Sequence, residues 1–480
     1  MAALGEIRGR VLSVASEAVP LIKTGGLADV VGALPAALAQ YGWDMRVLLP
    51  AYRVLRPKLD AMREVYFEAG LFGGDARVMA GEVAGMQVLL LDAPHLYDRE
   101  GGPYSGPAGD WFDNARRFAA LSWVAARIAR DGIDGWKPDV LHAHDWQAGF
   151  APAYLAYGGA SGVGSVMTIH NIAFQGWAQA SALGELRLPY EHFHPAGLEY
   201  YGGLSSLKAG LVTANAITTV SPNYARELMR PEFGMGLEGV ISARSSAVSG
   251  ILNGIDTSVW SPQNEPISYT SKAMKGKAAN REALASEFGL DVSGPLAILV
   301  SRLTDQKGID LLEAVVPDFV AAGGGLAILG SGDAVHEAKV LELAGRYPGK
   351  VSAKIGYDEA LSHRMFAGGD AVLVPSRFEP CGLTQIYGLA YGTVPVVSSV
   401  GGLADTVIHA SPAAISAGVA TGIVFHPVDV LAFGQALREL VALYAAPKVW
   451  GQIQRNAMKQ DVDWSASAAK YAALYESLSE

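Results

Sequence analysis

Residues 23–32 read KTGGLADVVG, and this stretch decides the fold of the first half of the chain. It follows the short apolar run Val11–Ser16, which is typical of a buried parallel strand. Because Gly25 and Gly26 carry no Cβ, a turn here predicts backbone N–H groups that an anion can approach closely. Lys23 adds a positive charge suited to a phosphate. A loop glycine pair beside a surface lysine is the alternative, and the coincidence of these features favours the anion site.

A helix is predicted directly after this turn, with Asp29 as its N-cap, because the apolar residues that follow recur at helical spacing. The motif then returns, since residues 401–407 repeat residues 25–31 at every position except Thr406. The second copy also follows an apolar stretch, so the repeat predicts two domains of one architecture. It has no counterpart of Lys23, and a packed turn explains it at least as well as a binding site.

The composition is typical of a well-packed α/β protein. With 480 residues, of which 50% are hydrophobic and 18% charged, the chain is expected to form two or three domains. A net charge of −10 argues against a nucleic-acid partner, and Cys381, the only cysteine, excludes an intramolecular disulfide. The chain has no apolar run of membrane-spanning length and no signal-peptide core at its N-terminus. We therefore expect a soluble cytoplasmic protein; residues 1–10 are assigned no role.

Short apolar strands alternate with helical patterns almost throughout, which predicts βαβ units and parallel sheets. Besides the first strand, we expect strands at Met45–Leu49, Gln87–Leu91, Val140–Ala143, Ser165–Thr168, Ala216–Val220, Ala297–Val300, Leu326–Leu329, Val351–Lys354, Ala371–Val374 and Val394–Val397, and helices at Asp113–Arg130 and Ser465–Leu478. Proline and polar residues in 256–271 predict an inter-domain connection. The predicted domains are residues 1–255 together with a terminal helix at 460–480, and residues 256–459.

Polar side chains gather directly after the predicted strands, where parallel α/β domains bind ligands. They are His142, His144, Asp145, His170, Asn171, Arg302, Lys307 and Glu379. This placement predicts a cleft at the carboxyl ends of the strands, between the two domains.

Seven motifs follow one another along the chain, at residues 23–30, 142–146, 168–176, 252–256, 301–308, 375–385 and 401–405. In this order they resemble the motifs of bacterial glycogen synthases and plant starch synthases, and the resemblance covers nearly the whole chain. It implies a GT-B glycosyltransferase with two Rossmann-like domains facing an inter-domain cleft, and a terminal helix that packs back on the first domain.

The resemblance also implies a reaction: glucose transfer from ADP-glucose to the non-reducing end of glycogen or another α-1,4-glucan, with retention of anomeric configuration. No cofactor is expected. A metal site from His142, His144 and Asp145 is disfavoured because the two histidines are expected on opposite faces of their strand. Asp461 and Asp463 are better explained as a cap of the terminal helix than as a metal motif.

Arg302 and Lys307 place two cations on a loop that leads into a helix. A diphosphate leaving group gains negative charge as its bond to sugar breaks, so fixed cations there lower the barrier. Two solvated surface charges are the alternative. The resemblance assigns both residues to the diphosphate, together with Lys23, Gly25 and Gly26.

The remaining donor contacts rest on the resemblance. It assigns Glu379 to the donor glucose, where the alternative is a helix-dipole charge. It assigns Tyr357 to stacking on the adenine, and it implies nucleotide-sugar contacts for Asn253, Gly382, Leu383 and Thr384. Cys381 has no evident activating base, so we interpret it as packing or lining the site rather than as a nucleophile.

His170 and Asp145 are the other candidates for catalysis. A histidine after a strand is as often a structural hydrogen-bonding residue, but the family places this one beside the reacting carbon of the donor sugar. The resemblance places Asp145 on the acceptor side of the reaction centre. Tyr104 and Trp146 are predicted to contact glucan, because sugars present apolar faces to aromatic rings.

Three other functions compete with this interpretation. A related transferase using UDP-glucose or another acceptor stays open, because the base-reading pocket is not visible in the sequence. A dinucleotide oxidoreductase requires Gly-x-Gly-x-x-Gly after the first strand, which the chain lacks there. A non-catalytic glucan-binding protein would tolerate loss of the charged motif residues, yet all are present.

We also expect the two domains to close around one nucleotide sugar, with a hinge near 253–271 and before the terminal helix.

Overall fold

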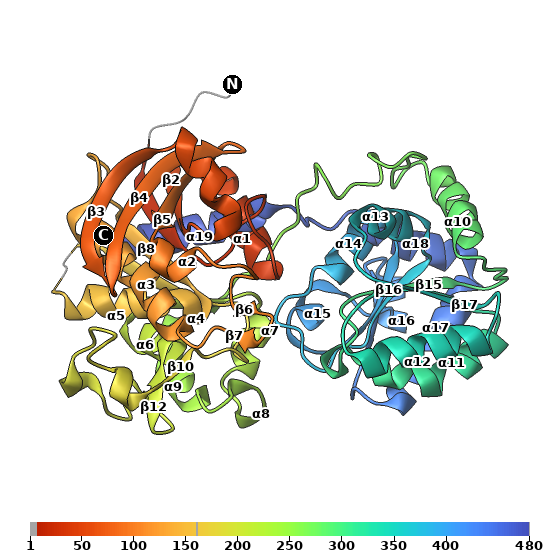
Figure 1. The fold of residues 1–480 in the computed structure, drawn as a ribbon. Coiled ribbons are helices and arrows are strands. Elements are labelled where there is room, and N and C mark those ends of the chain that lie inside the picture. Colours follow the sequence, from red (N-terminus) through yellow and green to blue (C-terminus); the bar gives the residue numbers. More distant parts are fainter. Residues whose placement is uncertain (1–6, 160–161, 480) are drawn as a thin grey trace. The chain divides into compact units, whose positions relative to one another are not determined.

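The computed structural model describes residues 7–159 and 162–479, and the chain divides into two compact units (Figure 1). The first unit runs to Leu252 and takes in the final helix from Trp464, whereas the second is Asn253–Asp463. Of the N-terminal residues that the sequence leaves without a role, 1–6 lie outside the described residues.

The first unit is built on a nine-stranded sheet with the order β14-β13-β9-β8-β1-β2-β5-β4-β3. All neighbouring pairs from β14 to β5 are parallel, and the β5-β4 and β4-β3 pairs are antiparallel. The strands are β1 Gly9–Val14, β2 Trp43–Pro50, β3 Arg63–Leu71, β4 Gly74–Val83, β5 Met86–Asp92, β8 Val140–His144, β9 Gly164–Ile169, β13 Ala216–Thr219 and β14 Val248–Gly250. Small sheets pair β6 Ser105–Gly106 with β7 Gly109–Asp110, and β10 Trp177–Gln179 with β12 Gly203–Ser205 and β11 Glu199–Tyr200.

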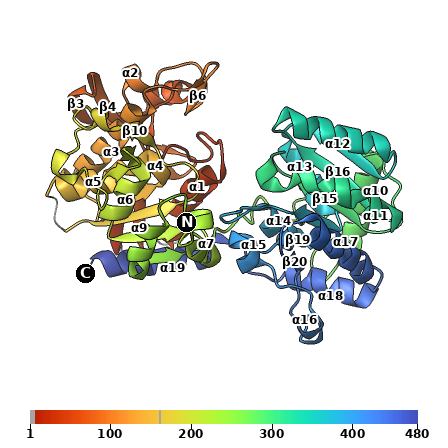
Figure 2. The ribbon, with the colours of Figure 1, turned by 90° about the horizontal axis from the view of Figure 1, so that it is seen from below.

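Helices cover both faces of this sheet, so its central strands β8 and β9 are fully buried, as is typical of parallel strands. The helices are α1 Gly26–Ala39, α2 Pro94–Tyr97, α3 Asn114–Asp131, α4 Asp145–Ala148, α5 Phe150–Tyr157, α6 Ser206–Thr213, α7 Pro222–Glu227, α8 Pro231–Gly234, α9 Glu238–Ala243 and α19 Trp464–Ser479. Helix α19 lies beside α1 in Figures 1 and 2. Its Trp464, Tyr471 and Tyr475 share a buried cluster with Leu34 and Val140.

The second unit has a six-stranded, entirely parallel sheet with the order β17-β16-β15-β18-β19-β20. Its strands are β15 Leu296–Val300, β16 Gly325–Gly330, β17 Val351–Ile355, β18 Ala371–Val374, β19 Val394–Ser398 and β20 Ile423–Phe425. Its helices are α10 Lys275–Glu287, α11 Leu312–Ala321, α12 Ala334–Arg346, α13 Glu359–Gly368, α14 Thr384–Tyr391, α15 Gly401–Thr406, α16 Pro412–Ser416, α17 Val430–Tyr444 and α18 Pro447–Ala457.

Two apolar clusters cover opposite faces of this second sheet. Strand β15 shows the division, because Ala297 and Leu299 join the cluster of α11, α12, α17 and α18, whereas Leu296 and Ile298 join that of α10, α13 and α14. Successive side chains of a strand point to opposite faces, so the alternating apolar run supplies both cores.

The predicted pair of α/β units with parallel sheets is confirmed, and each predicted strand and helix is present within a few residues of its expected ends. The β3-β4 hairpin was not predicted. Strand β3 is largely exposed and carries Arg63, Glu64 and Glu68, so it has no apolar run to signal it. Among the described residues, no helix has both the length and the apolar character needed to cross a membrane.

Candidate functional site

In the second unit, the loops after β15 and β18 are fastened to one another. The two strands are neighbours in a parallel sheet, so both loops leave at the same edge. The Arg377 backbone N–H donates to Gln306 O at 2.8 Å, and the Gln306 side chain donates to Phe378 O at 2.9 Å. Gly308 has φ +69°, and a Cβ there would lie 2.2 Å from Pro375 O. The close approach of these loops therefore depends on a glycine.

These loops bring Lys307 and Glu379 together. Lys307 Nζ lies 2.5 Å from Glu379 Oε2, and the Ser376 hydroxyl donates to the same oxygen at 3.0 Å. The side chains of Lys307 and Glu379 are only 16% and 10% exposed. Arg302 is exposed at the start of the first loop. The unit therefore presents a partly buried ion pair and a guanidinium at one sheet edge.

The segment after Glu379 is held by Gln385, whose side-chain amide donates to Cys381 O and Gly382 O, both at 2.9 Å. Gly382 has φ +76°, Leu383 is the N-cap of α14, and Thr384 is its first residue. Burial raises the pKa of the Cys381 thiol to about 12, so the thiol keeps its proton. This environment suits a packing residue better than a nucleophile.

In the second unit, the Asn253 side-chain oxygen is buried, whereas the Tyr357 side chain is exposed. A hydrogen bond from the Asn253 backbone to the Cys381 thiol places Asn253 beside that segment. Its Oδ1 is buried and has no hydrogen-bond partner in the described part of the chain. Tyr357, which follows β17, is 77% exposed and donates to Glu359 Oε2 at 2.8 Å. Most of this side chain is therefore in contact with solvent.

The second Gly-Gly pair packs against the Glu379 segment. An ideal Cβ on Gly401 would lie 1.9 Å from Glu379 O, and one on Gly402 would lie 2.2 Å from Cys381 O. At Gly25 and Gly26 nothing lies within 4 Å of such a Cβ. The two copies of the motif therefore differ: the second is a packed turn, and the first faces open space.

In the first unit, the neighbouring strands β1, β8 and β9 bring Asp145 and His170 together. Asp145 has φ +54° and begins α4, and its Oδ1 accepts the backbone N–H groups of His170 at 2.7 Å and Asn171 at 3.3 Å. Burial raises the pKa of Asp145 to about 7, although these two N–H groups lower it. The carboxyl group thus changes charge near neutral pH.

Three histidines form a buried row behind this turn. His144 Nδ1 lies 3.0 Å from His170 Nε2, and His144 Nε2 lies 3.2 Å from the Ser13 hydroxyl. His142 hydrogen-bonds the Tyr475 hydroxyl of α19 at 2.7 Å. Burial lowers the pKa of His142 and His170 to about 3, so both rings are neutral at pH 7.

The expectation that His142 and His144 point to opposite faces is wrong. Their ring centroids are 4.1 Å apart, because residues two apart on a strand share a face. Even so, no group of three His, Cys, Asp or Glu side chains in the described residues is placed to hold a metal ion.

The turn before α1 also departs from expectation. The N-cap is Gly25, not Asp29; Asp29 lies in the first turn and pairs with Lys23 at 2.8 Å. Glu17, which the sequence analysis missed, accepts the backbone N–H groups of Thr24 and Gly25. Glu17 therefore holds the backbone just ahead of the helix, and the N-cap Gly25 offers no side chain to the first turn.

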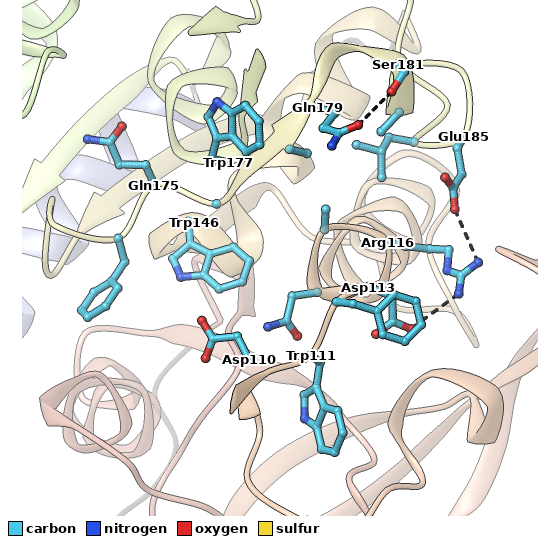
Figure 3. A pocket seen from close by; sticks show the side chains of 18 of the residues that line it. Asp110, Trp111, Asp113, Arg116, Trp146, Gln175, Trp177, Gln179, Ser181 and Glu185 are labelled. Carbon is cyan, nitrogen blue, oxygen red and sulfur yellow. Dashed lines mark hydrogen bonds and ion pairs between the residues drawn. The ribbon is translucent and has the colours of Figure 1, made fainter. Parts of the chain in front are cut away.

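A cavity of about 740 Å³ in the first unit is lined by aromatic and polar side chains (Figure 3). Its lining includes Trp111, Phe112, Trp146, Phe174 and Trp177, with Asp110, Asn114, Arg116, Gln175, Gln179 and Glu185. Arg116 lies between Asp113 at 3.5 Å and Glu185 at 3.4 Å. Aromatic faces with hydrogen-bonding groups between them suit an oligosaccharide.

Trp146 is the one residue of this lining for which the sequence predicts a sugar contact. Phe112 is 93% exposed in the structure. In the sequence, the signal that could have found it is an aromatic residue directly after a glycine-rich stretch. Tyr104 is not among the lining residues, and its ring centroid lies 6.5 Å from that of Trp146.

Comparisons with known proteins find glycosyltransferases along nearly the whole chain. Two family models match, the starch synthase catalytic domain over residues 10–243 and glycosyl transferases group 1 over residues 280–457. A glycogen synthase of Cereibacter sphaeroides is 70% identical over 98% of this chain and 99% of its own length. One of Paracoccus denitrificans is 55% identical, again over 98% and 99%.

Solved structures show the same relationship. The catalytic domain of starch synthase IV from Arabidopsis thaliana, bound to ADP and acarbose, matches with a TM-score of 0.86 at 31% identity, covering 98% of this chain and 99% of that chain. A sucrose-phosphate synthase from Thermosynechococcus elongatus, with a TM-score of 0.61 at 19% identity over 98% of this chain and 99% of that chain, shares the fold.

Proposed function

This chain belongs to the glycogen synthase family of glycosyltransferases, and we propose that it transfers glucose from ADP-glucose to the non-reducing end of an α-1,4-glucan with retention of anomeric configuration. The family predicted from the motifs is confirmed by full-length relatives, as is the two-domain GT-B fold. The ADP bound to the Arabidopsis starch synthase supports an adenosine donor.

The donor contacts that we propose in the second unit follow from the two fastened loops. Lys307 and Arg302 bind the diphosphate and offset the charge that it gains as it leaves. Glu379, held by Lys307 and Ser376, accepts hydrogen bonds from the donor glucose.

The nucleotide contacts that we propose lie around the same loops. Tyr357 stacks on the adenine, and the backbone of Gly382, Leu383 and Thr384 with Asn253 contacts the nucleotide sugar. The start of α14 offers N–H groups for this purpose.

The first unit supplies the acceptor side. The observation that carries this proposal is the position of Trp146, which lines the aromatic cavity and directly follows Asp145. A glucan held against that wall has its end beside the proposed reaction centre. His170, a neutral ring, contacts the donor sugar. Lys23 and the Gly26 backbone contact the diphosphate beside Gly25, whose N–H is held by Glu17.

For the reaction itself we propose front-face attack by the acceptor O4, without a covalent enzyme intermediate. The departing diphosphate oxygen accepts the acceptor proton as the bond from the anomeric carbon to that oxygen breaks. Lys307 and Arg302 stabilise the charge that develops on the diphosphate. A double displacement would need a carboxylate beside the anomeric carbon, and Asp145 is the candidate for that role.

Glucose transfer to glycogen from labelled ADP-glucose and UDP-glucose tests the proposal. We expect at least about tenfold higher kcat/KM with ADP-glucose. A preference for UDP-glucose would overturn the donor assignment, and β-configured product would overturn retention. We also propose a cytoplasmic location, which fractionation of the source cells tests.

No metal requirement is expected, because Arg302 and Lys307 supply the positive charge that the diphosphate needs. Activity should survive dialysis against EDTA. Loss of activity that magnesium or manganese restores would contradict this and would return attention to Asp461 and Asp463.

A pair of glycine variants separates packing from ligand contact. The free energy of unfolding of Gly26→Ala should lie within about 1 kcal/mol of the wild-type value, since its Cβ meets nothing. The variant should nevertheless lose activity, because the Cβ obstructs the approaching anion. Gly401→Ala should cost about 2 kcal/mol or more, because its Cβ clashes with Glu379 O. Thermal unfolding and initial rates measure both, and full activity in Gly26→Ala would remove that glycine from the site.

A further inference from the structure

The carboxylate of Glu17 accepts the Gly25 N–H, one of the groups predicted to contact a phosphate. Glu17 is 3% exposed and lies between β1 and α1. Its Oε2 accepts the backbone N–H groups of Thr24 and Gly25, the latter at 3.2 Å, and its Oε1 accepts the Thr24 hydroxyl at 2.5 Å. Two N–H groups ahead of α1 are therefore already paired with an anion that belongs to the chain itself.

The same carboxylate reaches the wall of the sugar cavity through Tyr104. The Tyr104 hydroxyl donates to Glu17 Oε1 and lies 2.7 Å from the Ser16 hydroxyl. The Tyr104 ring lies 6.0 Å from Phe118 and 6.5 Å from Trp146 between centroids, and Trp146 lines the cavity. Burial raises the pKa of Tyr104, so its hydroxyl keeps the proton that it donates.

Through these contacts Glu17 connects the backbone of the loop at Thr24 and Gly25 with Tyr104. Within the described residues, its four hydrogen-bond donors come from Thr24, Gly25 and Tyr104. Lys23, the cation of the same loop, pairs with Asp29 at 2.8 Å. A shift of Tyr104 therefore moves the acceptor that holds the backbone of the loop.

We propose that Glu17 is a positioning residue that couples acceptor binding to nucleotide binding. A glucan packed against Trp146 restricts Tyr104, which orders Glu17 and the Lys23–Gly26 loop before the nucleotide arrives. By linkage, the nucleotide strengthens glucan binding by the same factor. The inference rests on the proposed function, because it takes the glucan and the nucleotide as the two ligands.

Calorimetric titration of ADP, with and without saturating maltohexaose, measures this coupling. In wild type we expect maltohexaose to lower the Kd of ADP about fivefold or more. Glu17→Gln keeps one acceptor oxygen, which cannot serve both the loop N–H groups and the Tyr104 hydroxyl, so the factor should fall below about two. Tyr104→Phe removes only the connecting hydroxyl and should give the same loss.

Glu68→Gln is the matched control. Glu68 is a partly buried carboxylate of the same unit that accepts from Tyr66 at 2.7 Å and Trp123 at 2.9 Å and pairs with Arg187 at 3.2 Å, and none of these partners in the described chain belongs to the loop. It should keep the wild-type coupling factor. A merely structural loss would weaken ADP binding equally with and without maltohexaose, which leaves the factor unchanged.

An unchanged coupling factor in both Glu17→Gln and Tyr104→Phe would overturn the inference, as would a wild-type enzyme that transfers glucose but shows no coupling. If Glu17→Gln fails to fold by circular dichroism, Tyr104→Phe decides alone. Failure of the proposed function is distinct, because wild type would then transfer no glucose from ADP-glucose to glycogen.

Discussion

Lys307→Ala is expected to lower kcat for glucosyl transfer about a hundredfold or more, which corresponds to about 3 kcal/mol of transition-state stabilisation. The substitution removes a proposed diphosphate contact and leaves the Glu379 carboxylate with Ser376 alone from this pair of donors. Because the diphosphate gains charge only as it leaves, kcat should fall far more than the affinity for glycogen. Arg302→Ala should act in the same direction. Initial rates at saturating ADP-glucose and varied glycogen give both quantities.

Lys354→Ala is the control for this result. Lys354 also pairs with a glutamate of the second unit, Glu287 at 3.2 Å, but on the exposed surface. Its loss should leave kcat unchanged, since exposed pairs contribute little to stability. Near-wild-type turnover in folded Lys307→Ala would remove Lys307 from the proposed site.

Asp145→Asn is expected to lower kcat about a hundredfold while raising the thermal stability of the protein above neutral pH. The Asp145 pKa is raised from 3.8 to about 7, so the folded state binds a proton more tightly than the unfolded chain does. The wild type therefore loses stability as the pH rises from about 4 to 7, and the loss is complete above 7. Asparagine avoids this loss, keeps an oxygen for the His170 and Asn171 N–H groups, and tolerates the positive φ.

Thermal unfolding midpoints of wild type and Asp145→Asn at pH 5 and pH 8 test this predicted pH dependence. The advantage of Asp145→Asn over wild type should grow from pH 5 to pH 8. Asp131→Asn should behave oppositely, because a hydrogen bond from Arg130 lowers the Asp131 pKa, and so it should cost stability at pH 8. Wild-type activity in Asp145→Asn would argue against any charge-dependent role for this carboxylate.

The sequence predicted the central architecture well, because buried parallel strands such as Val140–His144 are short apolar runs with sharp ends. Strand ends also located Lys307 and Glu379, since neighbouring parallel strands leave the sheet at one edge. Their pairing depends on Gly308, which lets the two loops touch, and that contact joins segments about 70 residues apart.

What sequence reasoning missed depends on contacts between distant segments. Asp29 has the chemistry of an N-cap, but α1 begins at Gly26 and Asp29 pairs with Lys23, while Glu17 accepts the N–H groups just ahead of the helix. A single glutamate in a loop carries no pattern that would reveal this. The cavity likewise draws its lining from residues 110–116, Trp146 and residues 173–186, which only the folded unit brings together.

The discontinuity of the first unit has a consequence for synthesis on the ribosome. Trp464, Tyr471 and Tyr475 of α19 complete a cluster with residues that emerge more than 400 positions earlier, such as Leu34. The second unit, by contrast, is one uninterrupted segment, Asn253–Asp463. We therefore expect the second unit to fold from its own contiguous segment, whereas the first stays incomplete until residues 464–479 have left the ribosome. A released chain that lacks residues 464–480 should thus keep a protease-resistant second unit and a first unit that is readily cleaved.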